Sequence, residues 1–135
     1  MEDHELIELA AAAAGIKYDA DASKPKEGRQ WWGLWKTFDR EPSEYEKRYW
    51  NPLRDDGDAL RLAVTCGIDI RLFGLFPYDG KRHISTLVDR LGRGFNEYPG
   101  DGDALAATRR AIVRAASELT PNAEVSGAAS SRPLD

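Results

Sequence analysis

Cysteine and histidine are scarce in this chain, which has one cysteine and two histidines among 135 residues. The lone Cys66 cannot form an internal disulfide, and this agrees with a reducing compartment. So few soft ligands also exclude a zinc site made of cysteine and histidine alone. We therefore expect neither a disulfide framework nor a structural zinc ion.

Long hydrophobic runs are missing as well. The longest uncharged apolar run, Leu9 to Ile16, is far shorter than the roughly 20 residues that a transmembrane helix requires. The first residues do not follow the charged, apolar and small pattern of a signal peptide. We expect a cytoplasmic protein with no membrane partner.

The sequence also lacks the signatures of common enzymes. No glycine-rich loop ends in Lys-Ser or Lys-Thr, so a phosphate-cradling NTPase is not indicated. His83 lies near Ser85 and Asp89, but within one predicted strand and without a nucleophile elbow. The net charge of −4 argues against direct nucleic-acid binding. These absences favour a non-enzymatic protein with no catalytic residue and no cofactor.

What is present is the composition of a globular protein. Hydrophobic residues make up 41% of the chain and charged residues 31%. One domain is the natural expectation at this length. The stretch 121–135 is rich in Ala, Ser and Pro and is predicted to be a disordered tail. The expected organisation is a single domain over 1–120 followed by this tail.

The hydropathy pattern predicts an α+β fold in the order α-β-β-α-β-β-(β)-α. Apolar residues at helical spacing, with flanking caps, predict helices over 3–15, 56–66 and 101–119. Alternating apolar residues predict strands over 16–20, 31–38, 68–73 and 83–90, and a glycine-broken edge strand over 92–98. Hairpin connections predict one antiparallel sheet of four to five strands with the helices on one face. The charged segment 39–50 has no assignment.

The string Asp-Gly-Asp-Ala-Leu occurs twice, at 56–60 and at 101–105. Aspartates at helix starts accept hydrogen bonds from unpaired backbone N–H groups and are favoured by the helix dipole. This predicts Asp55 or Asp56 as the cap of one helix and Asp101 as the cap of another. The two copies then mark equivalent helix starts in a weakly duplicated β-β-α plan.

A metal site is the alternative, because Asp55, Asp56 and Asp58 bring oxygen ligands together. A calcium loop beginning at Asp55 needs an acidic residue at its twelfth position, where Cys66 stands. A magnesium site would require the two helix starts to lie side by side, and no pattern in the sequence indicates that. Helix capping is therefore the favoured interpretation.

All the tryptophans lie between residues 31 and 50, in the same window as Tyr45 and Tyr49. In a strand, Trp32 and Leu34 would face one side, and Trp31 and Trp35 the other. One face packs on the helices, and the other needs a cover. That cover is either segment 39–50 or a binding partner, since Trp and Tyr are enriched in binding hot spots.

A stacking platform for a nucleotide is a third interpretation of the same aromatic stretch. Nearby cations would assist stacking, and Arg29, Lys36 and Arg40 are the candidates. The sequence leaves these interpretations open.

Three strings carry a resemblance to a known group: Asp3-His-Glu-Leu-Ile-Glu-Leu-Ala followed by Ala-Gly-Ile, Trp50-Asn-Pro-Leu-Arg-Asp-Asp-Gly-Asp-Ala-Leu-Arg-Leu-Ala-Val, and Ala107-Thr-Arg-Arg-Ala-Ile-Val-Arg-Ala-Ala. With them the chain resembles small, uncharacterised early-region proteins of tailed bacteriophages, of the NinX-like kind. The resemblance implies a phage or prophage origin and a single small domain. It carries over no catalytic residue.

The leading hypothesis is a phage-encoded, non-enzymatic binding protein that acts in the host cytoplasm. It would inhibit a bacterial defence system or host enzyme complex through protein–protein contact, as an anti-CRISPR or related anti-defence protein does. The alternatives are a sponge for a nucleotide defence signal, which could be a homodimer, and a small phage enzyme. The predicted partner-binding residues are aromatic and acidic: Trp31, Trp35, Tyr45, Tyr49, Trp50, Asp55 and Asp56.

Overall fold

The computed structural model describes residues 1–44, 46–75, 82–88, 93–97 and 103–119. Along these residues the predicted α+β class is confirmed. The helices and strands are α1 (Asp3–Ala14), β1 (Leu34–Trp35), β2 (Tyr49–Trp50), α2 (Asp56–Cys66), β3 (Asp69–Leu75), β4 (Arg82–Val88), β5 (Arg93–Glu97) and α3 (Ala104–Ser117). The predicted tail, 121–135, lies outside the described residues.

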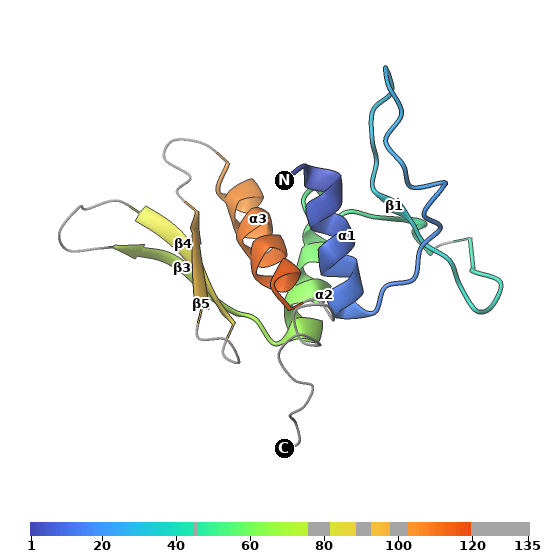
Figure 1. Ribbon diagram of the computed structural model, residues 1–135. Coiled ribbons are helices and arrows are strands. Elements are labelled where there is room, and N and C mark those ends of the chain that lie inside the picture. The colour runs from blue at the N-terminus through green and yellow to red at the C-terminus, as the bar shows by residue number, and fades with distance from the viewer. Residues whose placement is uncertain (45, 76–81, 89–92, 98–102, 120–135) are drawn as a thin grey trace.

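The described strands form two separate antiparallel sheets in place of the single sheet that we expected. One sheet pairs β1 with β2, and the other has the order β3-β4-β5. In Figure 1 the helices lie between the three-stranded sheet and β1. This helical layer is the physical reason that the strands divide, because it keeps the two hairpin regions out of hydrogen-bonding reach of each other.

The region of the first predicted hairpin also differs in detail from the prediction. The predicted strand over 16–20 is reduced to one bridge, between Tyr18 and Lys36. The partner of β1 is instead β2, which comes from the unassigned segment, with Leu34 opposite Trp50. The duplicated β-β-α plan is therefore wrong, since the two sheets differ in strand number and length.

Helix α3 is the centre of the core. It contacts α1, α2, β4 and β5, and its Ala111, Val113, Ala115 and Ala116 are fully buried. Small side chains allow the neighbouring elements to approach closely. On the sheet side, buried Thr86 of β4 donates a hydrogen bond from Oγ1 to the Ala111 carbonyl at 3.1 Å. The helical layer is thereby fastened to the three-stranded sheet.

The two copies of the repeated string begin their helices differently. Helix α2 is capped by Asp55, whose carboxylate accepts from the Asp58 N–H at 2.8 Å. Helix α3 is capped by Asp103, whose carboxylate accepts from two backbone N–H groups. Capping chemistry is confirmed, but the predicted equivalence of the two starts is wrong. Asp101, the predicted cap of the second copy, lies outside the described residues.

Within the described part of the chain, no helix combines the length and apolar character needed to cross a membrane.

Candidate binding surface

A buried carboxylate, Asp58, joins α2 to the segment before it. Its side chain is 1% exposed and accepts from the Lys47 ammonium at 2.6 Å, the Asn51 N–H at 2.9 Å and the Arg61 guanidinium at 3.0 Å. Burial raises the pKa of Asp58, but these three hydrogen bonds outweigh it and hold the pKa below its ordinary value. Asp58 is thus a structural anion whose partners are already in place.

A close approach of two backbone segments lies beside this carboxylate. Gly33 has φ +133°, and a Cβ built on it would lie 2.6 Å from the Trp50 carbonyl oxygen. The buried Asn51 amide donates from Nδ2 to the Trp32 carbonyl at 3.2 Å, while its Oδ1 accepts from the Leu53 N–H at 3.1 Å. These contacts hold the chain at residues 32–33 against residues 50–51, before the start of α2.

Because of the Gly33 conformation, the tryptophan that faces solvent differs from the one expected from strand alternation. Trp31 and Trp32 precede β1, so the strand alternation that we predicted for them does not apply. The Trp32 side chain is 55% exposed, although the pattern had placed it on the same face as Leu34, which is fully buried. Trp32 is therefore a surface aromatic residue that the sequence analysis did not select.

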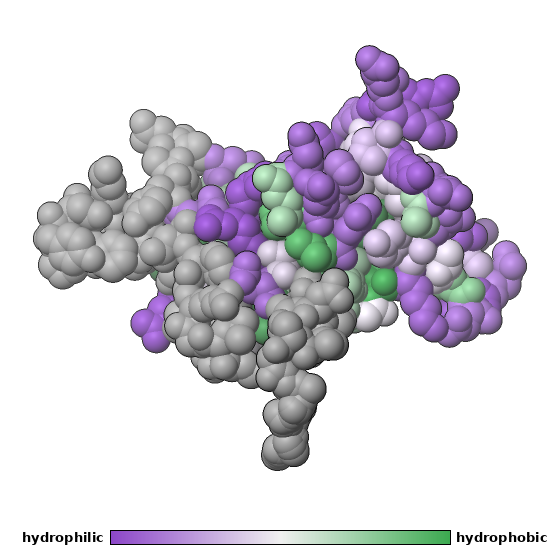
Figure 2. Space-filling model, in the orientation of Figure 1, coloured by the Kyte–Doolittle hydropathy of each residue, from purple (hydrophilic) through white to green (hydrophobic). Residues whose placement is uncertain are grey.

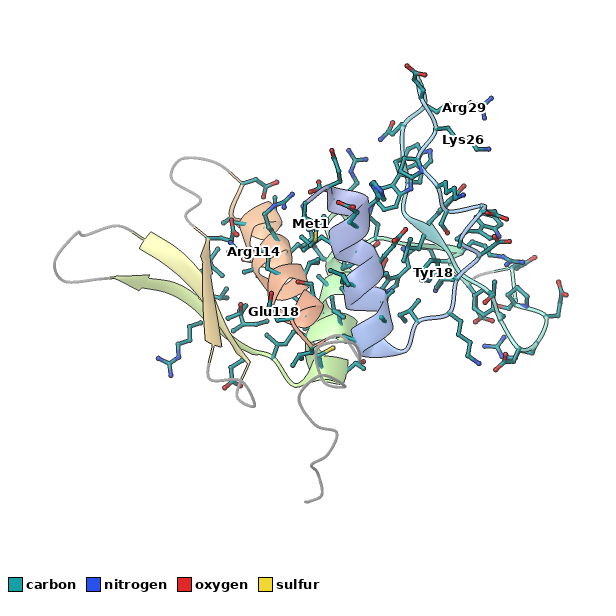
Figure 3. The ribbon with its side chains drawn as sticks, viewed as in Figure 1. Met1, Tyr18, Lys26, Arg29, Arg114 and Glu118 are labelled. Atoms are coloured by element: carbon teal, nitrogen blue, oxygen red, sulfur yellow. The ribbon has the colours of Figure 1, made fainter. Side chains whose placement is uncertain are left out.

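The segment 21–30, which we call the basic loop, stands out from the body of the molecule. Figure 3 shows Lys26 and Arg29 toward its outer end, and Figure 2 shows hydrophilic side chains around them. A backbone hydrogen bond from Arg29 N–H to the Lys26 carbonyl, at 3.1 Å, closes a turn there. Gly28 provides the left-handed conformation in this turn, with φ +77°.

Buried Ser23 fastens the basic loop to β1. Its Oγ accepts from the Trp35 N–H at 2.8 Å, and its carbonyl accepts from the Trp31 indole N–H at 2.8 Å. The loop and the aromatic residues are therefore positioned together.

Replacing Ser23 with Ala should lower the free energy of unfolding by about 1–2 kcal/mol, because the Trp35 N–H loses its acceptor. Thermal or urea unfolding followed by circular dichroism measures the change. The exposed Thr37→Ala is the control and should change stability by less than about 0.5 kcal/mol. Equal losses in the two variants would show that Ser23 does not hold the loop.

The basic loop and the aromatic side chains enclose a pocket of about 390 Å³, which we call the basic–aromatic pocket. The lining residues are Ala22, Lys24, Lys26, Arg29, Gln30, Trp31, Trp32, Gly33 and Tyr49. Three of them are cations, and no carboxylate from the described residues lines the pocket. Its surface is thus positive and aromatic, in a chain whose net charge is −4.

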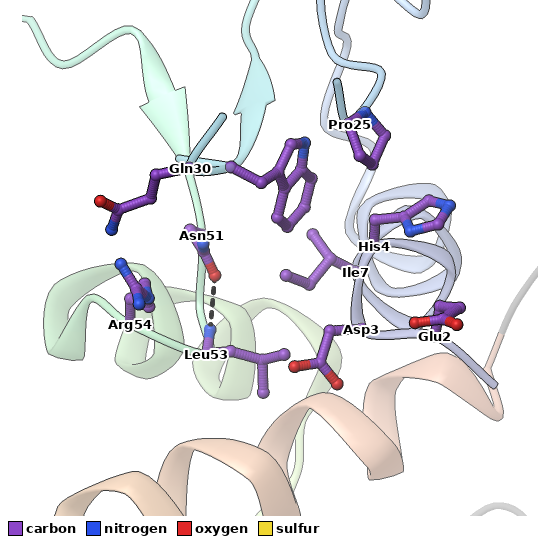
Figure 4. Close-up of a pocket in the computed structure, with 10 residues that line it drawn as sticks. Glu2, Asp3, His4, Ile7, Pro25, Gln30, Asn51, Leu53 and Arg54 are labelled. Atoms are coloured by element: carbon purple, nitrogen blue, oxygen red, sulfur yellow. Dashed lines mark hydrogen bonds between the residues drawn. The ribbon is translucent and has the colours of Figure 1, made fainter. Parts of the chain in front are cut away.

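A second pocket, of about 320 Å³, lies at the start of α1 (Figure 4) and shares Gln30 and Trp31 with the basic–aromatic pocket. Ile7, Leu53 and Pro25 give it an apolar part, while Glu2 and Asp3 add carboxylates and Arg54 adds a cation. Asp3 is already paired with Arg110 of α3 at 3.2 Å. Because its charge is mixed, this pocket is a weaker candidate than the basic–aromatic pocket for a charged ligand.

The structure distributes the predicted aromatic site residues over three environments. Trp50 is 3% exposed and belongs to the core. Trp31 and Trp35 are half-buried, and Trp35 meets Tyr49 edge-on at 5.0 Å between ring centroids. Tyr49 is exposed and lines the basic–aromatic pocket, as Trp31 does. Tyr45 lies outside the described residues.

The predicted acidic site residues have structural partners instead. Asp55 caps α2, and Asp56 pairs with the Arg109 guanidinium of α3 at 2.6 Å. Of the predicted stacking cations, Arg29 lines the basic–aromatic pocket, while Lys36 and Arg40 lie over the Phe38 ring. Lys24 and Lys26 were not predicted as site residues, although their spacing with Arg29 around Pro25 and Gly28 indicates a basic loop.

Across the residues that the structure describes, no group of three or more His, Cys, Asp or Glu side chains is arranged to hold a metal ion. Burial raises the pKa of the Cys66 thiol, which favours its neutral form at neutral pH.

Comparisons of this chain with protein-family models, with curated proteins and with solved structures find no match. The phage resemblance stays a prediction from the sequence, and the function is inferred from the surface itself.

Proposed function

We propose that the protein is a non-enzymatic binding protein that captures an anionic partner at the basic–aromatic pocket. The observation that carries this proposal is the placing of Lys24, Lys26 and Arg29 beside the exposed Trp32 and Tyr49. Tryptophan, tyrosine and arginine are the residues enriched at binding hot spots. Opposite charge on the partner would also raise the rate of association.

Binding by a rigid surface fits the way in which the pocket is supported. Ser23 holds the loop from one side, and Asn51 holds the Trp32 carbonyl from the other. A preorganised surface loses less conformational entropy when the partner binds. The aromatic side chains are thus presented for binding without a large rearrangement.

The biological role that we propose is phage anti-defence in the host cytoplasm, and the sequence resemblance supports the phage origin in this proposal. The partner in the leading hypothesis is a protein of a host defence system or a host enzyme complex, which this protein would inhibit. A nucleotide defence signal is the second candidate, and the cations and rings of the pocket favour it specifically. The proposed binding residues are now Lys24, Lys26, Arg29, Trp32 and Tyr49, together with Trp31.

Capture from a lysate of phage-infected host cells tests the proposal. The tagged full-length protein should enrich a partner, identified by mass spectrometry of proteins and of released small molecules. Trp32→Ala and Arg29→Ala should each reduce the enrichment by about tenfold or more, because hot-spot residues contribute about 2 kcal/mol or more. Trp32→Ala keeps the backbone carbonyl that Asn51 contacts, so the fold should be retained.

The matched controls for capture lie away from the pocket. Leu60 is a 62% exposed apolar residue on α2. Lys17 is an exposed cation whose partner is the exposed Asp39. Leu60→Ala and Lys17→Ala should capture as the unmodified protein does. The proposal would be contradicted if the control variants lost the partner while Trp32→Ala and Arg29→Ala still enriched it.

A further inference from the structure

The basic–aromatic pocket combines two recognition elements that single out one class of ligand. We propose that it binds a nucleoside phosphate, with the base stacked on Trp32 and Tyr49 and the phosphates held by Lys24, Lys26 and Arg29. This inference rests on the proposed function and names the ligand of the same site. Its grounds are the exposure of the rings, the freedom of the cations and the size of the pocket.

The aromatic element is exposed on a supported backbone. Trp32 is 55% exposed and Tyr49 is 39% exposed. The Tyr49 ring is held by its edge-on contact with Trp35, and the Trp32 backbone is held by Asn51. Stacking of a base on such a ring contributes about 1–3 kcal/mol and tolerates any base. The Gln30 side chain, also in the lining, offers both a donor and an acceptor for a base edge.

The cations of the pocket are largely unpaired and so can bind phosphate. Among the described residues, Lys26 and Arg29 have no ion-pair partner, and Lys24 has a loose contact with exposed Asp21, at 3.6 Å. Glu27 belongs to the same loop but does not line the pocket. Three cations around one cavity match a group with several negative charges, and a guanidinium can hold phosphate oxygens in bidentate fashion.

The size of the pocket and its surroundings favour a single nucleotide over a nucleic-acid strand. A cavity of about 390 Å³ lies at the small end of ordinary ligand sites. The neighbouring pocket, which shares Gln30 and Trp31 with it, is lined by Glu2 and Asp3 as well as Arg54, so it does not continue the positive surface that a phosphate backbone would need. The net charge of −4 opposes strand binding further.

Isothermal titration calorimetry of the full-length protein tests this inference, with ATP as the probe. Adenosine supplies the ring alone, and tripolyphosphate supplies the charge alone. ATP should bind at least about tenfold more tightly than either, because it uses both elements. Trp32→Ala and Arg29→Ala should each weaken ATP binding by about tenfold, while Leu60→Ala and Lys17→Ala should leave it unchanged.

Three results would overturn the inference. The first is that ATP gives no heat of binding. The second is that ATP and tripolyphosphate bind with equal affinity and Trp32→Ala changes neither. The third is that an acidic peptide binds more tightly than ATP. If ATP fails while capture from lysate still depends on Trp32 and Arg29, the nucleotide is excluded and the proposed binding function stands. If capture is also independent of these residues, both proposals fail.

Discussion

Replacing Asp58 with Ala is expected to lower the free energy of unfolding by about 3 kcal/mol, the cost of breaking a buried, charge-assisted hydrogen-bond network. The change removes the acceptor of the buried Asn51 N–H, which water cannot easily replace. It also releases Lys47 and Arg61, whose exposed side chains can return to solvent. Urea unfolding followed by circular dichroism measures the loss.

The control for this prediction is Asp39→Ala. Asp39 is 90% exposed and contacts Lys17 at 3.7 Å, so its loss should change the unfolding free energy by less than about 0.5 kcal/mol. Similar effects of the two substitutions would show that Asp58 is not a structural anion.

Acid should weaken the same network. The pKa of Asp58 is lowered in the folded protein, so below its ordinary value of 3.8 the unfolded chain takes up the proton first. The contribution is fully present above this value and is lost as the pH falls through the folded pKa. Asp58→Asn removes the titrating group and should flatten this part of the stability profile as the pH falls below 3.8.

Gly33→Ala should also destabilise the protein, by about 3 kcal/mol, since it combines backbone strain with overpacking. The new Cβ would lie 2.6 Å from the Trp50 carbonyl oxygen and 2.8 Å from the Asn51 Cβ, in a backbone conformation with φ +133°. Relief of these contacts would move the chain at Trp32, so ligand binding should weaken as well. Unfolding and capture measured on the same variant test both effects.

Gly28→Ala is the matched control for Gly33→Ala. Gly28 has φ +77°, but no atom lies within 4 Å of a Cβ built there. Its substitution should cost about 1 kcal/mol from the left-handed backbone alone. An equal cost at both glycines would show that the close approach at Gly33 contributes nothing.

Local signals were sufficient to predict the helices. Predicted spans over 3–15, 56–66 and 101–119 correspond to α1, α2 and α3, since acidic caps, apolar spacing and the stop at Gly15 depend on neighbouring residues. The division of the strands into two sheets could not be predicted this way. It depends on where the helices pack, which involves residues far apart in the sequence.

The residues of the candidate pocket were predicted in part. The window 31–50 contains Trp31 and Tyr49, which do line the pocket. Alternation failed at Trp32 because Gly33 takes a conformation that no strand pattern includes. Trp50 was selected for its ring, yet it packs opposite Leu34 in the core. Whether a single aromatic residue is buried depends on tertiary contacts, so composition cannot predict its burial.

The acidic repeat illustrates a second limit of sequence reasoning. Its carboxylates were correctly expected at helix starts, but Asp56 and Asp58 also make contacts with residues distant in the chain or in the preceding segment. Asp58 is itself buried, whereas Asp56 pairs with Arg109 at the surface. Our proposal therefore centres on the positively charged basic loop, while the predicted binding role of Asp55 and Asp56 stays a prediction.

Amide hydrogen exchange gives the most direct test of where this protein binds. The full-length protein is measured alone and as eluted with the partner that it captures from lysate. Our account predicts slower exchange in the bound form at residues 22–33, with no change in α2 or β3. Protection of α2 or β3, with exchange at 22–33 unchanged, would contradict it.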